Sequence, residues 1–404
     1  MDACSILHLP LNQSNSSVLE IGMHWFPEGG GGGADRYFHG LVTAIQQLDE
    51  PFRALAYSEA PDGIAEEPGL ERLGSRTLGG LERLKRVRKA TRHYLGSQTG
   101  RSVIATHFAL YALPIIDCFQ SNPHVVHFHG PWAEESAIEG GGRLAVFAKR
   151  QIERLVYSTA SRFIVLSEAF AQVLVKQFRI RRDRIAVIPG GVDPQAFQVG
   201  FSRSEARDKL GWPRDRRIIL CIRRLARRMG LEELINAMDV VRRHCPDALL
   251  LMAGTGHLQE SLANQIVTAG LGGHVRLVGF MQEADLPRAY RAADLSIVPS
   301  QTLEGFGLVT LESLAAGTPV LVTPVGGLPE AVSGLDRHLI LPGTSVQDLA
   351  DGLLKSLNGS LLLPDEKACR EYVSTHFSWN RIAQRVLQVY QECIPQPRYV
   401  SLPA

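Results

Sequence analysis

Residues 304–312 read Glu-Gly-Phe-Gly-Leu-Val-Thr-Leu-Glu, and this stretch points to the fold. Its two glycines lack a Cβ, so the backbone there can approach a ligand closely. Apolar residues recur at helical spacing from Leu308 to Ala315, which predicts a helix beginning just after Gly307. A glycine-rich turn leading into a helix offers free backbone N–H groups to an anion. Glu304 then precedes the turn and Glu312 lies about one turn into the helix; the alternative is a surface loop before an ordinary helix.

Short apolar runs alternate with helical patterns along the whole chain. This alternation favours parallel sheets covered by helices on both faces. Helical stretches include residues 232–245 and 258–269. Runs typical of buried strands are Val18–Met23, Val103–Thr106, Val125–His127, Phe163–Leu166, Ile185–Ile188, Ile218–Ile222, Leu249–Met252, Val275–Val278, Leu295–Val298 and Val320–Thr323. Two such series, in 404 residues, predict two doubly wound α/β domains.

The stretch 304–312 resembles the E-x7-E signature of family 4 retaining glycosyltransferases. The resemblance extends over about residues 18–395 and is strongest in the second half. Segments that follow the family's order are Ile188–Asp193, Ala253–Gly256, Val278–Phe280, Ala316–Val320, Gly326–Glu330 and Phe377–Trp379. The resemblance implies the GT-B fold, in which two Rossmann-like domains face an interdomain cleft. It also implies transfer of a hexose from a nucleoside diphosphate sugar to a hydroxyl, with retention of the anomeric configuration.

A domain division follows from these patterns. We expect a flexible N-terminal tail over residues 1–17 and an acceptor-side domain over 18–197. A nucleotide-sugar-binding domain then covers 198–381, because a polar, glycine-containing stretch separates the two series of strands. By resemblance, the last helix, about 382–395, crosses back to the first domain.

Composition excludes several classes of protein. Apolar residues make up 45% and charged residues 21%, as in ordinary globular proteins, and the net charge of +2 is too small to indicate nucleic-acid binding. No apolar run is long enough to span a membrane, and no leader peptide is recognisable. The cysteines are scattered without metal-ligand spacing, which favours reduced thiols and a cytoplasmic location: Cys4, Cys118, Cys221, Cys245, Cys369 and Cys393.

Residues 81–95 combine an apolar stripe with many basic side chains. The stripe comprises Leu81, Leu84, Val87, Thr91 and Tyr94. A basic amphipathic helix can lie on an anionic membrane, which predicts peripheral contact at the inner face of the membrane. The alternative is that the stripe packs on the protein's own sheet.

Five consecutive glycines, Gly29–Gly33, follow the first predicted strand. They do not form the dinucleotide motif, because Arg36 stands where its third glycine would be. The run resembles the family's loop near the donor phosphates, which Gly32 and Gly33 would approach; the alternative is a flexible surface loop. Asp35 and Arg36 open the next helix and are candidates for acceptor contact.

Histidines follow two of the predicted strands in the first half. Alternation places His127 and His129 on one side of their strand. By resemblance, His129 lies near the reacting sugar carbon and stabilises developing positive charge there. His107 ends another strand and is a weaker candidate for acceptor contact, with a structural role as the alternative.

A basic turn at residues 223–228 follows the first strand of the second domain. Arg224 can bind a phosphate through two N–H groups. The family usually has lysine five residues later, where this chain has Met229. Arg228 or Arg227 then supplies the second charge, or the phosphates are held differently; a solvated basic turn is the alternative.

The remaining candidate donor contacts come from the resemblance. Glu304 would bind hydroxyls of the sugar, and Glu312 those of the ribose. The backbone of Gly305, Phe306, Gly307 and Leu308 would meet the sugar and the distal phosphate, with Gly254 and Phe280 near the base. No Asp-x-Asp pair follows a predicted strand, so we expect no cofactor and no obligatory metal.

Donor and acceptor stay open at this point. UDP-sugars are favoured, with GDP-sugars next, and the acceptor hydroxyl would belong to a sugar, a glycolipid or a polysaccharide precursor. The alternatives are a GT-B nucleotide-sugar epimerase or phosphorylase, and a non-catalytic protein that binds sugar nucleotides.

Overall fold

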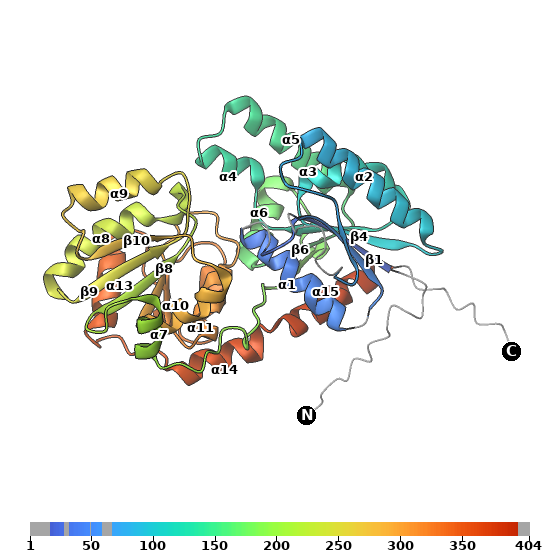
Figure 1. Ribbon diagram of the computed structural model, residues 1–404. Coiled ribbons are helices and arrows are strands. Elements are labelled where there is room, and N and C mark those ends of the chain that lie inside the picture. Colours follow the sequence, from blue (N-terminus) through green and yellow to red (C-terminus); the bar gives the residue numbers. More distant parts are fainter. Residues whose placement is uncertain (1–16, 28–31, 49, 59–66, 395–404) are drawn as a thin grey trace.

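The computed structural model describes residues 17–27, 32–48, 50–58 and 67–394, which form two parallel sheets covered by helices (Figure 1). The first sheet has the strand order β3-β2-β1-β4-β5-β6-β7 and the second β10-β9-β8-β11-β12. The strands of the first sheet are β1 Ser17–His24, β2 Phe52–Tyr57, β3 Leu70–Arg72, β4 Ser102–Thr106, β5 His124–Phe128, β6 Arg162–Val165 and β7 Ile185–Val187. Those of the second are β8 Arg217–Ile222, β9 Ala248–Ala253, β10 Val275–Gly279, β11 Leu295–Val298 and β12 Val320–Val322.

Helices connect the strands in both halves. In the first half they are α1 Gly33–Gln47, α2 Gly80–Ser97, α3 Ala109–Ala112, α4 Trp132–Ile138, α5 Arg143–Thr159 and α6 Glu168–Phe178. In the second half they are α7 Arg203–Leu210, α8 Leu231–His244, α9 Gln259–Thr268, α10 Leu286–Ala292, α11 Leu308–Ala315, α12 Leu328–Val332, α13 Val346–Leu357, α14 Glu366–His376 and α15 Trp379–Cys393. The predicted pair of doubly wound α/β units is confirmed.

The ten predicted strands and the helix after Gly307 are present, and each strand bound agrees with the prediction to within one residue. Two strands, β2 and β3, were not predicted. β2 interrupts its apolar residues with Arg53, and β3 is only three residues long, so neither gives a clear apolar run. Ser17, expected at the end of the flexible tail, is instead buried and begins β1. Residues 1–16, Gly29–Gly31 and residues 395–404 lie outside the described residues, so the structure does not address the rest of the tail or most of the glycine run.

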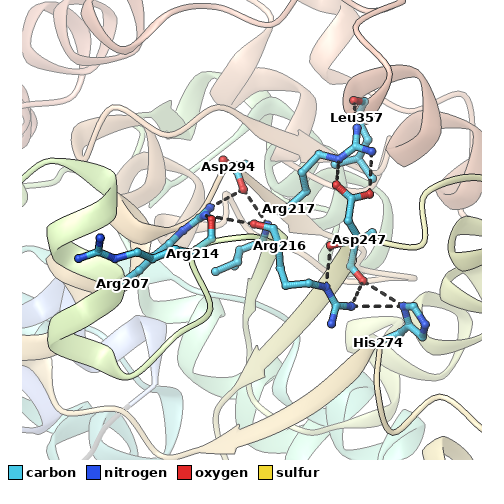
Figure 2. Close-up of polar contacts among 10 residues, drawn as sticks. Arg207, Arg214, Arg216, Arg217, Asp247, His274, Asp294 and Leu357 are labelled. Atoms are coloured by element: carbon cyan, nitrogen blue, oxygen red, sulfur yellow. Dashed lines mark hydrogen bonds and ion pairs between the residues drawn. The ribbon is translucent and has the colours of Figure 1, made fainter.

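Ion pairs and hydrogen bonds of several arginines link the elements at the amino ends of the strands of the second sheet (Figure 2). Arg217 forms a two-point ion pair with Asp247, which precedes β9. Arg207 of α7 reaches Asp294, whose carboxylate also accepts from the backbone N–H of Ile218. This arginine cluster lies at the sheet edge opposite the strand ends that carry the candidate site, so we assign it to folding. It also joins α7 to the second sheet.

The chain returns to the first sheet through α15. Its Trp379 ring lies 5.4 Å from that of Tyr37 on α1, and the hydroxyl of Tyr390 donates to Glu20 of β1. Beside this crossing, Val192 and Ser378 form an isolated parallel bridge. Two crossing segments therefore run next to each other, while the domain boundary at 197/198 stays a prediction.

Helix α2 packs the middle of its apolar stripe inward, while Leu81 at the start of the stripe is 78% exposed. Val87 and Thr91 are fully buried, and Val87 belongs to a cluster with residues of β1, β2 and β4. On its outer side, Arg88 and Arg92 both pair with Asp117. No helix among the described residues combines the length and apolar character needed to cross a bilayer.

Candidate active site

The candidate residues gather at the two points where strand order reverses. In the first sheet this point lies between β1 and β4, and in the second between β8 and β11. Open α/β sheets bind ligands beyond the carboxyl ends of the strands at such points. The loop after β8 carries Arg223 and Arg224, and the loop after β11 carries Glu304.

Glu304 is buried against a cation that the sequence did not single out. Its carboxylate forms an ion pair with Arg223 and accepts from the Ser300 hydroxyl at 3.1 Å. Burial by itself favours the neutral acid, but the charge and hydrogen bond of Arg223 outweigh it, so the pKa of Glu304 is lowered. Glu304 is therefore ionised at neutral pH.

Arg223, rather than Arg224, is the arginine that faces Glu304. The Arg223 guanidinium also lies 2.8 Å from the sulfur of Met229 and donates to Ser300. Its Nε is buried without a partner among the described residues. Arg224 is exposed, and its contact with a phosphate stays a prediction. One signal in the sequence could have pointed to Arg223. A second arginine stands beside Arg224, and Met229 stands where the family usually has lysine.

Glycines shape the loops around this ion pair. Gly307 has φ +77° at the start of α11, a left-handed conformation that favours glycine. At Gly254, with φ +137°, a Cβ would collide with the backbone carbonyl of Arg223. Leu303 holds φ +52° without being glycine, a strained conformation directly before Glu304. Phe280 follows β10 beside Gly254 and is exposed, as a base-contacting ring would be.

Arg36 was expected to face an acceptor, but its guanidinium pairs with carboxylates of the second half. Its guanidinium reaches across to the second half, where it bonds to Glu312 at 3.0 Å and forms an ion pair with Glu283. Tyr290 donates to the other oxygen of Glu312 at 3.0 Å. The acceptor contact of Arg36 stays a prediction, and in this structure its guanidinium pairs with the carboxylate expected to bind ribose.

Replacing Arg36 by alanine is expected to strengthen nucleotide binding several-fold, up to about tenfold (about 1.4 kcal/mol). Without its cation, the buried Glu312 keeps only Tyr290, and ribose hydroxyls then meet no competitor. Isothermal titration with UDP measures the change. Arg88→Ala, which removes an exposed ion pair on α2, serves as the control. Unchanged or weaker binding by Arg36→Ala would contradict a competing role.

Arg228 also joins the two halves instead of facing a donor phosphate. It donates to the carbonyl of Leu303 at 2.6 Å and lies 3.3 Å from the carboxylate of Glu135 on α4. Nearby, Glu330 accepts from the backbone N–H groups of Glu168 and Ala169 at the start of α6. The predicted donor contact of Arg228 is not supported, because its guanidinium braces the loop that carries Glu304.

His129 is the outer member of a buried chain of polar groups. Its Nε2 lies 3.0 Å from Nδ1 of His107, whose Nε2 lies 3.0 Å from Glu20. The second oxygen of Glu20 accepts from the hydroxyl of Tyr390, which also contacts His127. His127 and His129 share one side of the strand, as alternation predicts. Both ring nitrogens of His107 are engaged inside the protein, so the expected acceptor contact of His107 is not supported.

Hydrogen-bond direction in this chain depends on one proton at Glu20. When Glu20 is ionised it accepts from Nε2 of His107, so Nδ1 of His107 accepts from Nε2 of His129. His129 Nδ1 then holds a lone pair, and it has no partner among the described residues. When Glu20 is protonated, the order reverses and His129 Nδ1 carries a proton. Burial raises the pKa of Glu20 and so favours its protonated form.

The buried histidines make stability depend on pH. Burial lowers the pKa of His107, His124 and His129 to about 3, so these rings are neutral in the folded protein at neutral pH. The unfolded chain binds their protons below about pH 6.5. Stability is therefore expected to fall as pH drops from about 6.5 towards 3, by at most about 1.4 kcal/mol per pH unit for each histidine.

Urea unfolding midpoints at pH 7.5, 6.5 and 5.5 measure this loss. His124 stacks on Phe119 and bonds to two threonines within the first half, so His124→Gln is expected to reduce the slope. A midpoint that stays constant down to pH 5.5 would contradict the assignment of neutral buried rings.

At the start of α1, Asp35 is enclosed by the protein, whereas Gly32 and Gly33 have open space beside them. Asp35 is buried and accepts from the backbone N–H of His24 at 3.2 Å, so its expected acceptor contact is not supported. At Gly32 and Gly33, a Cβ would meet no protein atom within 4 Å. The protein itself thus does not require glycine there, which leaves room for a ligand beside the helix start.

The facing atoms of Glu20, His107 and His127 lie close enough to share one ion. They are already joined through hydrogen bonds to one another and to Tyr390. All three are buried beneath His129, so the group is better suited to orient His129 than to take up a metal. Together, the site offers an ionised carboxylate, a free guanidinium, a helix N-terminus and a neutral imidazole.

Comparisons with known proteins identify the family. The model described as Glycosyltransferase Family 4 matches residues 31–196, and that described as Glycosyl transferases group 1 matches residues 202–375. A D-inositol 3-phosphate glycosyltransferase of Corynebacterium jeikeium is 32% identical over 289 residues, which cover 67% of this chain and 67% of that protein. Alignments with three curated relatives span 59%, 67% and 60% of their lengths.

Solved structures share the fold at low identity. Sucrose-phosphate synthase from Thermosynechococcus elongatus gives a TM-score of 0.78 at 24% identity, covering 93% of this chain and 98% of that one. HepE from Anabaena, solved in complex with UDP and glucose, gives 0.71 at 19% identity, covering 93% and 99%. These likenesses establish the GT-B fold. With both halves matched by family models and a relative aligned over two thirds of its length, the chain belongs to glycosyltransferase family 4.

Proposed function

We propose that this protein is a hexosyltransferase that moves a hexose from a nucleoside diphosphate sugar to a hydroxyl, with retention of the anomeric configuration. The observation that carries the proposal is the ionised Glu304, paired with Arg223 directly before the N-terminus of α11. A carboxylate that accepts from sugar hydroxyls thereby stands beside backbone N–H groups suited to a phosphate.

The proposed chemistry divides between the two halves. Charge on the leaving diphosphate is stabilised by Arg224 and by the backbone of Gly305–Leu308. Glu304 holds the sugar, and Glu312 binds the ribose once Arg36 has left it. His129, neutral at working pH because burial lowers its pKa, lies near the reacting carbon and tolerates developing positive charge. The acceptor hydroxyl attacks from the same face of the sugar that the diphosphate leaves, and the leaving phosphate takes the proton of that hydroxyl.

UDP-sugars are the favoured donors, with GDP-sugars next. HepE, which shares the fold, was solved with UDP and glucose, in keeping with a uridine donor. The acceptor hydroxyl is proposed to belong to a sugar, a glycolipid or a polysaccharide precursor. No cofactor or obligatory metal is included in the proposal. Unpaired Cys118, Cys221, Cys245, Cys369 and Cys393 support a cytoplasmic location.

Peripheral membrane contact through residues 81–95 stays part of the proposal. Val87 and Thr91 of the apolar stripe are buried and Leu81 is 78% exposed, while Arg88 and Arg92 pair with Asp117.

Nucleotide-sugar hydrolysis without acceptor tests the proposed function. The purified protein is incubated with UDP-, GDP- and ADP-sugars in the presence of EDTA, and release of the nucleoside diphosphate is followed. Slow release from one donor identifies the base and supports metal-free transfer. No release, together with no thermal stabilisation by any nucleotide, would overturn the proposal in favour of a non-catalytic protein.

A further inference from the structure

Strand β1 carries a carboxylate inside an apolar core. Glu20 lies between Leu19 and Ile21, and its side chain is fully buried. Alternation turns Leu19 and Ile21 towards the cluster that they share with β2 and β4, so Glu20 faces the other side of the sheet, where α1 and α15 pack. A buried carboxylate destabilises a fold unless its partners compensate. Its place in a central strand therefore points to a use other than packing.

Two sets of hydrogen-bond donors converge on Glu20. The hydroxyl of Tyr390 donates to one oxygen at 2.7 Å, and Nε2 of His107 lies 3.0 Å from the other. The hydroxyl of Tyr390 also contacts Nε2 of His127. Because Tyr390 gives its own proton to Glu20, His127 is the donor in that contact. Groups from β5, from the loop after β4 and from α15 therefore meet at one carboxylate of β1.

Glu20, His107 and His129 form a line of hydrogen bonds, here called the histidine relay, whose outer end is unsatisfied. Nδ1 of His129 is buried and has no partner among the described residues. Buried polar atoms are nearly always paired, so an unpaired one at the candidate site marks the position of a ligand group. The ring is held by His107 at 3.0 Å and packs against Tyr37, with ring centroids 5.0 Å apart. Its place is fixed, and its proton is what remains to be set.

The proton at Glu20 decides what His129 presents to a ligand. A proton that enters at Nδ1 of His129 sends the Nε2 proton of that ring to Nδ1 of His107, and the Nε2 proton of His107 passes to Glu20. Both rings stay neutral, and the carboxylate becomes a carboxylic acid. A lone pair at Nδ1 accepts from a sugar hydroxyl and turns the negative end of the ring dipole towards a developing positive charge, whereas an N–H group turns the positive end.

We propose that Glu20 is a positioning residue for the transfer, because through His107 it fixes which nitrogen of His129 carries the proton. In the working state Glu20 is ionised and Nδ1 of His129 holds a lone pair. Tyr390 stabilises that state and makes the returning helix α15 part of the site. The inference rests on the proposed function, since it assigns Glu20 a role in that reaction.

Other titratable groups surround the histidine relay. On α1, Tyr37 packs against the three histidine rings, and the charge of Asp35 acts on His129. On α15, the charge of Arg385 acts on Tyr37. Burial lowers the pKa of the three histidines and raises the pKa of both tyrosines, so these groups titrate away from neutral pH. Burial moves the pKa of Glu20 upward, towards neutral pH. We therefore expect Glu20 to be the member of the relay that titrates.

The pH dependence of donor hydrolysis tests the proposal. Release of UDP from UDP-glucose, or of the matching diphosphate from the donor that the hydrolysis panel identifies, is followed with the full-length protein between pH 5.5 and 9.5. Turnover is expected to rise with pH as Glu20 loses its proton. Tyr390 occupies the amide oxygen in Glu20→Gln, so the amide N–H₂ donates to His107. Turnover is then expected to stay about tenfold or more below the upper plateau of the parent protein, without the rise.

Tyr390→Phe gives a shift of opposite origin. The hydroxyl of Tyr390 favours the ionised form of Glu20, so its removal raises the pKa of that carboxyl further. The rise in turnover is expected to move to higher pH, with the same upper plateau. A role of Glu20 in packing alone would change the thermal midpoint and leave the pH dependence as it is in the parent protein.

Glu153→Gln is the matched control. Glu153 is another buried carboxylate of the first half, which accepts from the backbone N–H groups of Trp132 and Ala133, and burial raises its pKa to about 7. Titration of Glu153 would produce a similar rise in turnover. The variant is expected to keep the rise, and loss of the rise in Glu153→Gln with its retention in Glu20→Gln would overturn the proposal.

Ring-nitrogen NMR of protein labelled with ¹⁵N-histidine observes the tautomer without turnover. His129→Gln assigns the signals of His129. In the parent protein, Nδ1 of His129 is expected to carry a proton at the low end of the pH range and a lone pair at the high end. In Glu20→Gln it is expected to carry a proton throughout. UDP affinity by isothermal titration is expected to be the same in both proteins, since the relay lies beneath the sugar.

Three further results would overturn the proposal. The first is a tautomer of His129 that is the same in the parent protein and in Glu20→Gln at every pH, while donor is hydrolysed; this rejects the positioning role alone. The second is a stoichiometric metal ion in the purified protein, held by Glu20, His107 and His127. The third is silence of the hydrolysis assay in the parent protein with the tautomer switch intact, which rejects the role in transfer together with the proposed function.

Discussion

Replacing Glu304 by glutamine is expected to reduce donor turnover by about 100-fold or more. Each hydrogen bond between a sugar hydroxyl and an ionised carboxylate contributes about 1.5–3 kcal/mol, and two such contacts correspond to at least two factors of ten. Glutamine keeps the size of the side chain and one carbonyl oxygen, so the loop of α11 keeps its packing. Release of nucleoside diphosphate from the preferred donor measures the effect.

The same substitution also leaves Arg223 without its counter-ion, which is expected to lower the thermal midpoint. Turnover is therefore measured well below that midpoint. Glu366→Gln is a matched control, since Glu366 pairs with Arg291 and Arg370 on the outer side of the second half. Full turnover in folded Glu304→Gln would contradict the assignment of Glu304 to the donor sugar.

Moving the positive charge beside Glu304 is the second experiment with a large expected effect. Arg223→Met is expected to lower turnover about 100-fold, because Glu304 loses the cation that keeps it ionised. The sulfur of Met229 lies 2.8 Å from the guanidinium of Arg223, so a lysine at 229 reaches the same space. The double variant Arg223→Met/Met229→Lys is expected to regain at least about tenfold in turnover over Arg223→Met, since one cation again faces the carboxylate.

A double-mutant cycle isolates this coupling, with Met229→Lys as its fourth corner. Met229→Lys alone is expected to lower turnover, because two cations then compete for Glu304. Arg227→Met, on the same turn but exposed, is expected to leave turnover unchanged. A folded double variant no better than Arg223→Met would contradict the idea that turnover needs a cation beside Glu304.

Local chemistry made much of the site predictable. Glycines, strand ends and helix starts follow from neighbouring residues, so the positions of Glu304, Glu312, Arg224 and His129 within their loops and helices agree with expectation. Strands β2 and β3 were not predicted from the sequence. Short or interrupted apolar runs become strands only when a neighbouring strand pairs with them.

The inward packing of part of the α2 stripe was one of two alternatives that the sequence left open. An apolar stripe has the same sequence pattern whether it contacts a membrane or a sheet. The position of β2 and β4 beneath α2 decides that Val87 packs on the sheet. Leu144, Phe147 and Leu155 of α5 are the converse case, because their apolar side chains look like core residues in the sequence but are exposed in the fold.

The sequence by itself determined two α/β units, ten of the twelve strands among the described residues and the loops that carry polar residues, because periodicity and backbone freedom are local properties. Only the tertiary structure decided which charges meet. Arg36 and Glu312 are 276 positions apart, and Tyr390 and Glu20 are 370 apart. Such pairs depend on how α1, α11 and α15 are brought together, and no local pattern records a partner that far along the chain.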